Sequence, residues 1–215
     1  MAQEGVRVEQ LQAWMYRFAD LVADECEHLT TLDAAIGDGD HGLNMDRGMR
    51  AVRDKLAAMS PATAEELFKL VGMTLVSNVG GASGPLFGTF FLRLGSGCGR
   101  SEVLALEVLA NAVRAGVEGV VERGRPALGD KTMFDALSPA LDALDVAVAA
   151  GQPPSICFFR ASEAAIEGRD ATVAMIAGKG RASYLGERSA GHQDPGATSS
   201  ALLFAAAAAA FSGDS

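Results

Sequence analysis

The sequence predicts an all-α fold of eight or nine packed helices. Hydrophobic residues make up 49% of the 215 residues but aromatic residues only 6%, so Ala, Leu and Val supply most of the apolar surface. Alanine is the strongest helix former, and this composition favours closely packed helices over a β-sandwich. Apolar residues also recur at helical spacing along the chain, and no segment shows a convincing strand pattern.

Periodicity and capping signals define the elements in order. Apolar residues at helical spacing from Val8 onward predict the first helix, which is expected to begin at about Val6, and the same pattern returns from Met45 in the second. Thr63 opens the third helix through a capping box. The predicted helices span residues 6–28, 43–59, 63–77, 83–95, 101–123, 131–149, 154–167, 170–177 and 194–211.

Proline and serine mark the later helices. Pro85 and Pro195 stand in predicted first turns, where the missing N–H is not needed. Ser101 is expected to cap the fifth helix, and Pro139 is expected to bend the sixth. No linker or repeat divides the chain, so we expect residues 1–215 to form one domain.

Charge and cysteine content exclude several function classes. The net charge is -9 without a Lys/Arg cluster, so nucleic acid and anionic membranes are poor partners. Three cysteines without CxxC spacing are expected to be buried thiols in a reducing cytosol, and no signal peptide is apparent. A cytoplasmic location follows. Residues 201–211 are very apolar but too short to span a bilayer, so they should form a core helix.

Glycine is abundant, at 25 residues, and it clusters at the predicted junctions between helices. Glycine allows a backbone to approach a ligand closely, and helix N-termini attract anions. Several glycine-rich junctions beside helix starts therefore predict an anion site at one end of the bundle.

Three carboxylates gather in the segment DAAIGDGDHG, on a glycine-rich turn that leads into a helix. Asp33, Asp38 and Asp40 would repel one another, and Mg²⁺ prefers oxygen ligands held in this way. An EF-hand is excluded, because its spacing requires an acidic residue near position 49, where the chain has Met49. The alternative is that these residues are only turn formers and helix caps.

Other segments have features that suit a nucleotide. Ser83 lies in GGASGP at a helix start, where N–H groups and a hydroxyl can hold a phosphate, although an ordinary capped start has the same pattern. The Walker A pattern is absent. Arg181 can reach a phosphate from a loop of about 15 residues, and Asp194 can cap the last helix, contact a nucleotide or do both. Met133 can line a base or pack in the core.

Acidic turns and phosphate-type loops are compatible when Mg²⁺ lies between them, so the residues predict a Mg-nucleotide or Mg-phosphate site. Four motifs also occur in a familiar order: DAAIGDGDHGLNM, GGASGPLFGTFF, GDKTM and GRASYLGERSAGHQDPGATSS. They resemble the L subunit of dihydroxyacetone kinase, and the resemblance covers the chain from about Leu29 to the last helix.

The resemblance implies an up-and-down antiparallel barrel of about eight amphipathic helices, with a nucleotide pocket at one end. It implies an adenine nucleotide, ADP or ATP, bound with two Mg²⁺ ions. The implied metal ligands are Asp33, Asp38 and Asp40. The implied nucleotide contacts are His41, Gly42, Leu43, Asn44, Ala82, Ser83, Gly124, Met133, Arg181, Asp194, Pro195 and Gly196. No catalytic acid or base is implied in this chain.

The resemblance also implies partners. Dihydroxyacetone would be held on a separate K subunit, and ADP would stay bound and be rephosphorylated by the phosphohistidine of a phosphotransferase-system carrier, the M subunit. The chain would therefore act in a homodimer or a heteromeric complex. Alternatives are a subunit of an ATP-dependent kinase for a short ketose such as erythrulose, a nucleotide-loaded regulatory module that contacts a transcriptional regulator, and a purely structural bundle.

Overall fold

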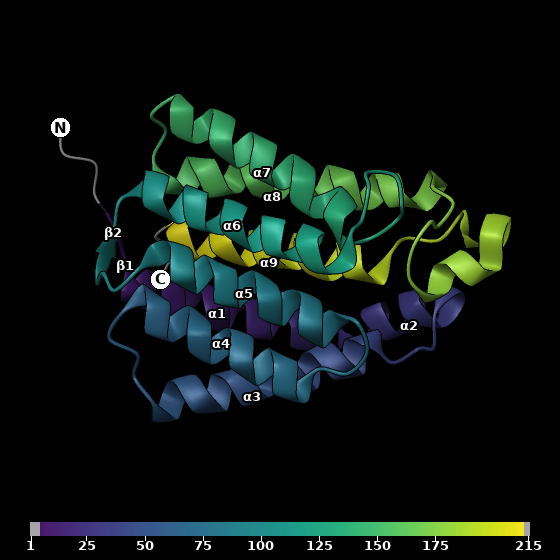
Figure 1. The fold of residues 1–215 in the computed structure, drawn as a ribbon, viewed down its shortest axis with the longest axis horizontal. Coiled ribbons are helices and arrows are strands. Elements are labelled where there is room, and N and C mark those ends of the chain that lie inside the picture. Colours follow the sequence, from purple (N-terminus) through teal and green to yellow (C-terminus); the bar gives the residue numbers. More distant parts are fainter. Residues whose placement is uncertain (1–4, 213–215) are drawn as a thin grey trace.

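The computed structural model describes residues 5–212, and this part of the chain is almost entirely helical (Figure 1). It contains nine α-helices, two short 3₁₀ segments and one pair of two-residue strands. The all-α prediction is therefore confirmed. In chain order the elements are β1 (Val6–Arg7), α1 (Val8–Asp24), α2 (Cys26–Ile36), α3 (His41–Ala58), α4 (Ala64–Asn78), α5 (Ser83–Cys98), β2 (Val103–Leu104), α6 (Leu106–Gly124), α7 (Met133–Ala149), α8 (Pro154–Ala171), η1 (Thr172–Ala174), η2 (Arg181–Ser189) and α9 (Pro195–Phe211).

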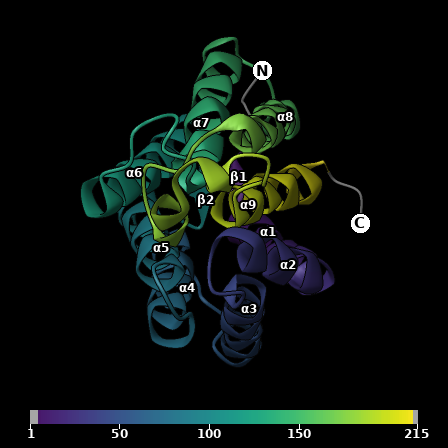
Figure 2. The same cartoon turned by 90° about the vertical axis from the view of Figure 1, so that its right-hand side faces the viewer.

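Eight of the described helices form a closed ring. α1 packs on α3, each helix from α3 to α9 packs on the next, and α9 packs back on α1. Successive helices of the ring run in opposite directions, so the ring is an up-and-down barrel (Figures 1 and 2). α2 extends beyond the end of α1 and packs on α3 and α9. This alternation brings the N-terminal ends of α3, α5, α7 and α9 to the same end of the barrel.

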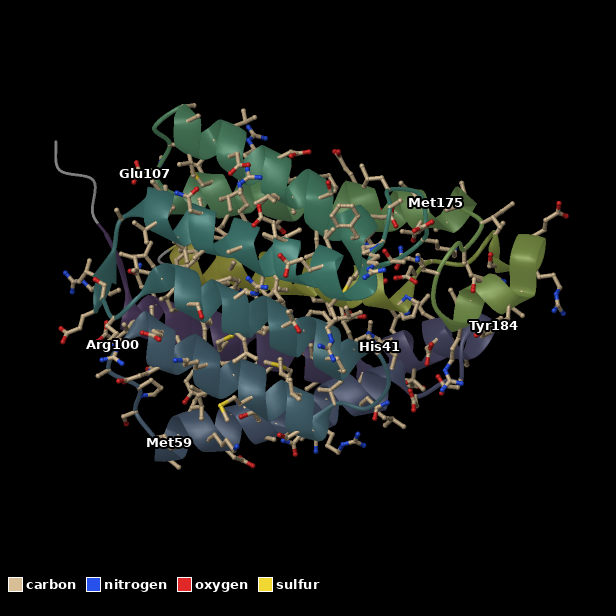
Figure 3. All side chains as sticks on the ribbon, viewed as in Figure 1. His41, Met59, Arg100, Glu107, Met175 and Tyr184 are labelled. Atoms are coloured by element: carbon tan, nitrogen blue, oxygen red, sulfur yellow. The ribbon has the colours of Figure 1, made fainter. Side chains whose placement is uncertain are left out.

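The opposite end of the barrel is filled by aromatic side chains. The Trp14 ring lies 5.8 Å from the rings of Phe68 and Phe158, and its indole N–H donates to the Leu203 carbonyl at 2.8 Å. All four residues are completely buried. The antiparallel pair β1–β2 lies across this end (Figure 1). Arg100 and Glu107 are at this end, whereas Tyr184 is at the other (Figure 3).

The first predicted helix is divided in two. Glu25 leaves the helical conformation, with φ −94° and ψ 8°, so α1 ends there and α2 continues to Ile36. Asp33 therefore lies in a helix and not on the turn that the sequence suggested. The break allows a close approach, because a Cβ at Gly42 of α3 would lie 2.0 Å from the Cys26 carbonyl oxygen.

Other differences arise from tertiary contacts. The expectation of no strand was wrong, because Val6 pairs with Leu104 across almost half of the chain. Ser101 does not cap α6, since its hydroxyl donates to the Val103 carbonyl at 2.5 Å and the helix begins only at Leu106. The separate helix predicted over 170–177 is also absent from the described chain. α8 continues past residue 170 to Ala171, and only the short η1 follows it.

Along the described residues, none of the helices is both long enough and apolar enough to cross a membrane. The most apolar helix, α9, packs on α1, α7 and α8 instead. Leu203 and Phe204 are fully buried, as the prediction of a core helix requires.

Candidate functional site

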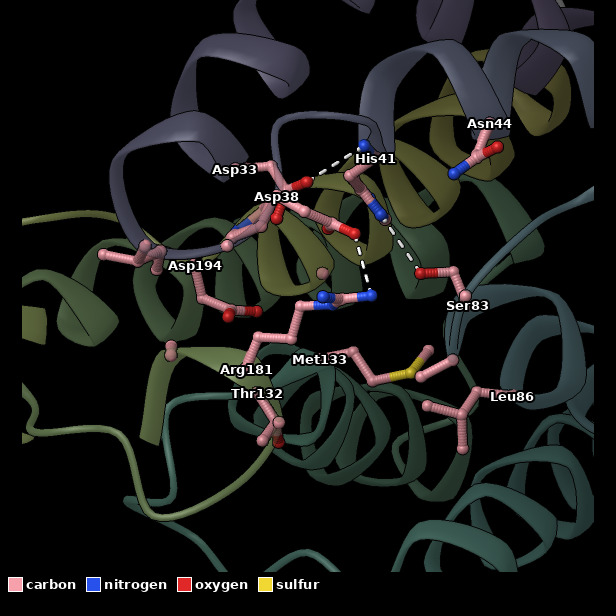
Figure 4. Close-up of a pocket in the computed structure, with 18 of the residues that line it drawn as sticks. Asp33, Asp38, His41, Asn44, Ser83, Leu86, Thr132, Met133, Arg181 and Asp194 are labelled. Carbon is pink, nitrogen blue, oxygen red and sulfur yellow. Dashed lines mark hydrogen bonds and ion pairs between the residues drawn. The ribbon is translucent and has the colours of Figure 1, made fainter. Parts of the chain in front are cut away.

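A cavity lies where the N-terminal ends of α3, α5, α7 and α9 converge (Figure 4). Each of these helices lines it with a cap residue or with residues of its first turn. Helix N-termini carry N–H groups without helical partners and the positive end of the helix dipole. This end of the barrel therefore favours a ligand with negative charge.

Three carboxylates form a cluster at the rim of this cavity. Asp33 of α2 and Asp38 and Asp40 of the following turn each offer one oxygen, and these oxygens lie within 4.8 Å of one another. Asp33 Oδ2 accepts the backbone N–H groups of Asp40 at 2.9 Å and His41 at 3.1 Å. Gly37 is needed beside it, because a Cβ there would lie 2.1 Å from Asp33 Oδ1. The turn is therefore folded tightly around the Asp33 carboxylate.

The guanidinium of Arg181 lies beside the carboxylate cluster. A terminal nitrogen of Arg181 lies 2.9 Å from Asp38 Oδ2, and both side chains remain partly exposed (Figure 4). The segment that carries Arg181 is fixed by a small apolar cluster in which Ala182 and Ala177 pack against Ile36 of α2. The predicted long loop thus has its own structure, η2, and holds a cation beside the three aspartates.

A buried imidazole connects three helices at the cavity. His41 Nδ1 lies 3.1 Å from Ser83 Oγ at the start of α5, and Nε2 lies 3.0 Å from Ser199 Oγ of α9. Burial lowers the pKa of His41 from its ordinary value, and the opposing effects of Asp33 and Asp40 are smaller. A neutral imidazole can then serve as donor at one nitrogen and acceptor at the other.

A buried lysine joins the segments before α7 and α9. Lys131 is 1% exposed, and its ammonium donates to the Thr172 carbonyl at 2.5 Å and to the His192 carbonyl. Asp194 caps α9 by accepting the Ala197 N–H at 2.7 Å. Burial raises the pKa of Asp194 to about 7, although the Ala197 N–H and the Lys131 ammonium lower it. Burial has the opposite effect on the Lys131 ammonium and lowers its pKa, because burial disfavours the charged form of either group.

The inner part of the cavity is apolar. Met133 begins α7, while Leu86 and Phe87 lie one turn into α5, and all three line the cavity. Thr132 fixes the start of α7, because its hydroxyl accepts the Phe134 N–H at 3.2 Å. A flat aromatic ligand can pack against such a wall while charged groups remain at the rim.

Twelve of the fifteen residues predicted for the site line this cavity. They are Asp33, Asp38, Asp40, His41, Asn44, Ala82, Ser83, Met133, Arg181, Asp194, Pro195 and Gly196. Their roles as ligands stay predictions.

The other three predicted residues do not line the cavity. Gly42 is buried against α2, Leu43 is 58% exposed, and Gly124 lies at the end of α6, where a Cβ would meet the Leu86 side chain at 3.3 Å. Their roles as nucleotide contacts also stay predictions. Sequence reasoning missed Lys131 and Leu86. Lys131 lies inside the GDKTM motif, and Leu86 lies three residues after Ser83, on the same face of a helix.

The comparisons with known proteins identify the family of this chain. The family model described as DAK2 domain matches residues 35–209. The chain is 47% identical over 190 residues to the PEP-dependent dihydroxyacetone kinase, ADP-binding subunit DhaL of Escherichia coli K12, an alignment that covers 88% of this chain and 90% of that protein. It is 40% identical to the PTS-dependent counterpart of Lactococcus lactis, over 89% of this chain and 91% of that protein.

Longer relatives contain a similar segment. The D-erythrulose kinase of Mycolicibacterium smegmatis is 36% identical over 86% of this chain but only 32% of its own length. The crystal structure of the dihydroxyacetone kinase of C. freundii in complex with AMP-PNP and Mg²⁺ matches with a TM-score of 0.73 and 27% identity, over 97% of this chain and 35% of that one. This chain therefore spans about a third of the length of that kinase. The expected resemblance is confirmed, and the chain belongs to the DAK2 domain family.

Proposed function

We propose that this chain is the nucleotide-binding subunit of a dihydroxyacetone kinase. The observation that carries the proposal is the placement of three carboxylates, with their oxygens within 4.8 Å, beside four converging helix N-termini. Carboxylates alone would repel a phosphate, so this combination suits a cation and a polyphosphate bound together. The names of the most similar relatives, ADP-binding subunits of dihydroxyacetone kinases, support the same function.

The donor set fits magnesium. Asp33, Asp38 and Asp40 offer hard oxygen ligands, and Gly37 leaves room for the Asp33 carboxylate to turn toward the others. Mg²⁺, when bound, would neutralise negative charge between these carboxylates and a nucleotide tail. We propose two such ions. The backbone N–H groups of Asp40 and His41 keep one Asp33 oxygen in a fixed position, so the protein itself preorganises this ligand.

The cavity suits an adenine nucleotide in one orientation. We assign the diphosphate to the rim, where Ser83, Arg181 and the starts of α3, α5 and α9 offer hydrogen-bond donors. The base is assigned to the apolar wall formed by Met133 and Leu86. Arg181 pairs with Asp38 through a single nitrogen, so its planar group retains further donors for a phosphate oxygen.

The proposed reaction is phosphoryl transfer by positioning. This chain would hold the nucleotide as one helical-barrel domain, and dihydroxyacetone would arrive on a separate K subunit at the cavity mouth. We propose that ADP remains bound and is rephosphorylated by the phosphohistidine carrier, the M subunit, in the cytoplasm. The aspartates act as metal ligands, because their crowding suits a cation better than a proton transfer. The acid or base for the sugar hydroxyl then belongs to the partner.

A second candidate is an ATP-dependent kinase for erythrulose or a similar short ketose. It is favoured by the 36% identity to a D-erythrulose kinase over 86% of this chain. The two candidates differ in how the nucleotide behaves. A carrier retains ADP during dialysis, whereas an ATP-dependent enzyme exchanges ADP for ATP readily. A regulatory module would bind the nucleotide without supporting turnover.

A coupled assay tests the proposal. The purified chain is loaded with ADP and Mg²⁺ and mixed with a dihydroxyacetone-binding K subunit and a phosphorylated carrier, and dihydroxyacetone phosphate is measured. The proposal expects product that depends on all three proteins and on Mg²⁺. Product formed only with free ATP would identify the second candidate, and nucleotide binding without product would identify a regulatory module.

A further inference from the structure

A continuous line of hydrogen-bonding side chains crosses the mouth of the barrel. Ser83 of α5, His41 of α3 and Ser199 of α9 follow one another at distances of 3.1 Å and 3.0 Å. Ser83 lines the cavity, whereas Ser199 is fully buried behind the imidazole and has no access to a ligand. Ser199 therefore could influence a bound nucleotide only through His41.

The hydroxyl of Ser199 has two hydrogen-bonding neighbours. It lies 3.0 Å from His41 Nε2 and 3.1 Å from the Gly196 carbonyl oxygen. The same carbonyl also accepts the Ser200 hydroxyl at the shorter distance of 2.8 Å. The Gly196 carbonyl thus remains satisfied without Ser199, so the Ser199 hydroxyl is available to the imidazole.

This arrangement couples the hydrogen bond at Nε2 of His41 to the hydrogen bond at Nδ1. A neutral imidazole has one N–H and one acceptor nitrogen. If Ser199 donates to Nε2, Nδ1 carries the proton and donates to Ser83; if Ser199 accepts, Ser83 must donate to Nδ1. In both cases the partner at Nε2 fixes the direction of the hydrogen bond to Ser83 and the angle of the ring.

We propose that Ser199 is a positioning residue for the nucleotide site, which holds His41 in one tautomer and orientation and thereby orients the Ser83 hydroxyl at the cavity. The proposal rests on the proposed function, because it takes a nucleotide as the ligand of this cavity. Ser199 touches neither the metal ligands nor the cavity. Its effect on binding is entirely indirect, and this distinguishes it from the residues predicted to contact the nucleotide.

The chain offers a matched control for this test. Ser200 is the next residue of α9, is also fully buried, and donates to the same Gly196 carbonyl, but unlike Ser199 it makes no hydrogen bond to the imidazole. Calorimetry with ADP and Mg²⁺ should show about tenfold weaker binding for Ser199→Ala and less than about twofold change for Ser200→Ala. In a His41→Ala background, Ser199→Ala should have no further effect, because the residue acts through that ring.

Failure of this inference differs from failure of the proposed function. Wild-type protein that binds no ADP with Mg²⁺ would refute the function itself. Wild-type binding with equal losses for the two serine variants, or an equal further loss in the His41→Ala background, would overturn the role of Ser199.

Nitrogen-15 NMR of labelled histidine provides a readout that does not depend on affinity. The His41 signals should report one dominant tautomer in the wild-type protein and in Ser200→Ala, and a changed tautomer ratio in Ser199→Ala. The Pro195 carbonyl also lies near this ring and favours a proton on it. If that carbonyl alone holds the imidazole, the signals will be identical in all three proteins, and the proposal is refuted.

Discussion

The two ends of the barrel are formed by the same eight helices but have opposite chemistry. At the end crossed by β1 and β2, Trp14 and its aromatic neighbours Phe68 and Phe158 are fully buried. At the other end, a buried lysine, a buried aspartate and three crowded carboxylates surround a cavity. Burial of apolar surface stabilises the first end, whereas buried charge opposes folding at the second.

The difference indicates that one end of the barrel stabilises the fold and the other forms the candidate site. An up-and-down ring places alternate N-termini at both ends, so helix dipoles alone cannot explain why only one end forms the candidate site. The junctions account for the difference. At the cavity end, Arg125 and Lys131 have positive φ, 47° and 60°, although both carry side chains, whereas Gly99 and Gly151, which have positive φ at the other end, are glycines. Positive φ at residues with side chains costs free energy and is concentrated at functional sites.

The largest effect is expected for Trp14→Ala, which should lower stability without changing nucleotide binding. Trp14→Ala removes the centre of the aromatic cluster and should lower the free energy of unfolding by about 3–5 kcal/mol. The affinity of the folded protein for ADP and Mg²⁺ should not change, because the cavity is at the other end. Urea unfolding and calorimetry measure the two quantities. Tyr184→Ala is the control, since Tyr184 is 88% exposed and should change stability by less than about 0.5 kcal/mol. A loss of affinity in folded Trp14→Ala would show that the two ends are coupled.

For Asp38→Asn we expect a loss of affinity without a loss of stability. Loss of one charged ligand should weaken Mg²⁺-dependent ADP binding by about a hundredfold, while stability changes by less than about 0.5 kcal/mol. Retention of ADP on a desalting column, with and without EDTA, gives the measurement. Asp20→Asn removes an exposed carboxylate that pairs with Arg53 and does not line the cavity, and it should leave retention unchanged. Equal retention by wild type and Asp38→Asn would count against the role of Asp38 as a ligand.

A smaller effect is expected from pH at the cavity end. The pKa of Asp194 is raised to about 7 by burial, from an ordinary value of 3.8. A carboxyl group with a raised pKa binds its proton more tightly in the folded state, so the folded protein should lose stability as pH rises from about 4 to 7. Asp194→Asn keeps a capping oxygen but does not titrate, so its stability relative to wild type should increase across this range.

Urea unfolding of both proteins over this pH range tests the sign. The control is Asp142→Asn, which changes an exposed carboxylate on α7. Its free energy of unfolding should change with pH in the same way as that of the wild-type protein. If the free energy of unfolding of Asp194→Asn also changes with pH as in wild type, the Asp194 carboxyl is not held in its protonated form by burial.

The smallest effect is expected at the apolar end. Thr63 caps α4 by accepting the Glu66 N–H at 3.3 Å, and Thr63→Ala should cost about 1 kcal/mol of stability. ADP affinity should remain unchanged, as for Trp14→Ala, and a joint loss would again indicate coupling between the ends. Thermal unfolding followed by circular dichroism measures the stability change.

Much of the fold could be predicted because its signals are local. The Thr63 cap and the Asp194-Pro195 start of α9 identify helix ends correctly. The break at Glu25 could not be predicted, because neither glycine nor proline marks it and the helix divides where α2 meets α3. The strand pair was missed for a similar reason, since Val6 finds its partner only in the folded chain.

The candidate site could be predicted in part. The aspartate cluster and Arg181 stand in unusual local sequences, and the structure brings them together. Ser199 and Lys131 lie inside two of the quoted motifs, but the local sequence does not show their contacts, because a serine in an apolar helix and a lysine beside a turn are ordinary residues. Their importance depends on neighbours more than 40 residues away, His41 for Ser199 and His192 for Lys131.

The central claim is that one end of the barrel holds a nucleotide through a metal on three aspartates. A crystal structure of the wild-type protein grown with ADP and Mg²⁺ tests it most directly. We expect metal density within coordinating distance of Asp33, Asp38 and Asp40, with the diphosphate at the starts of α5 and α9. Aspartates that face solvent beside an empty cavity, or a nucleotide bound elsewhere on the barrel, would contradict the claim.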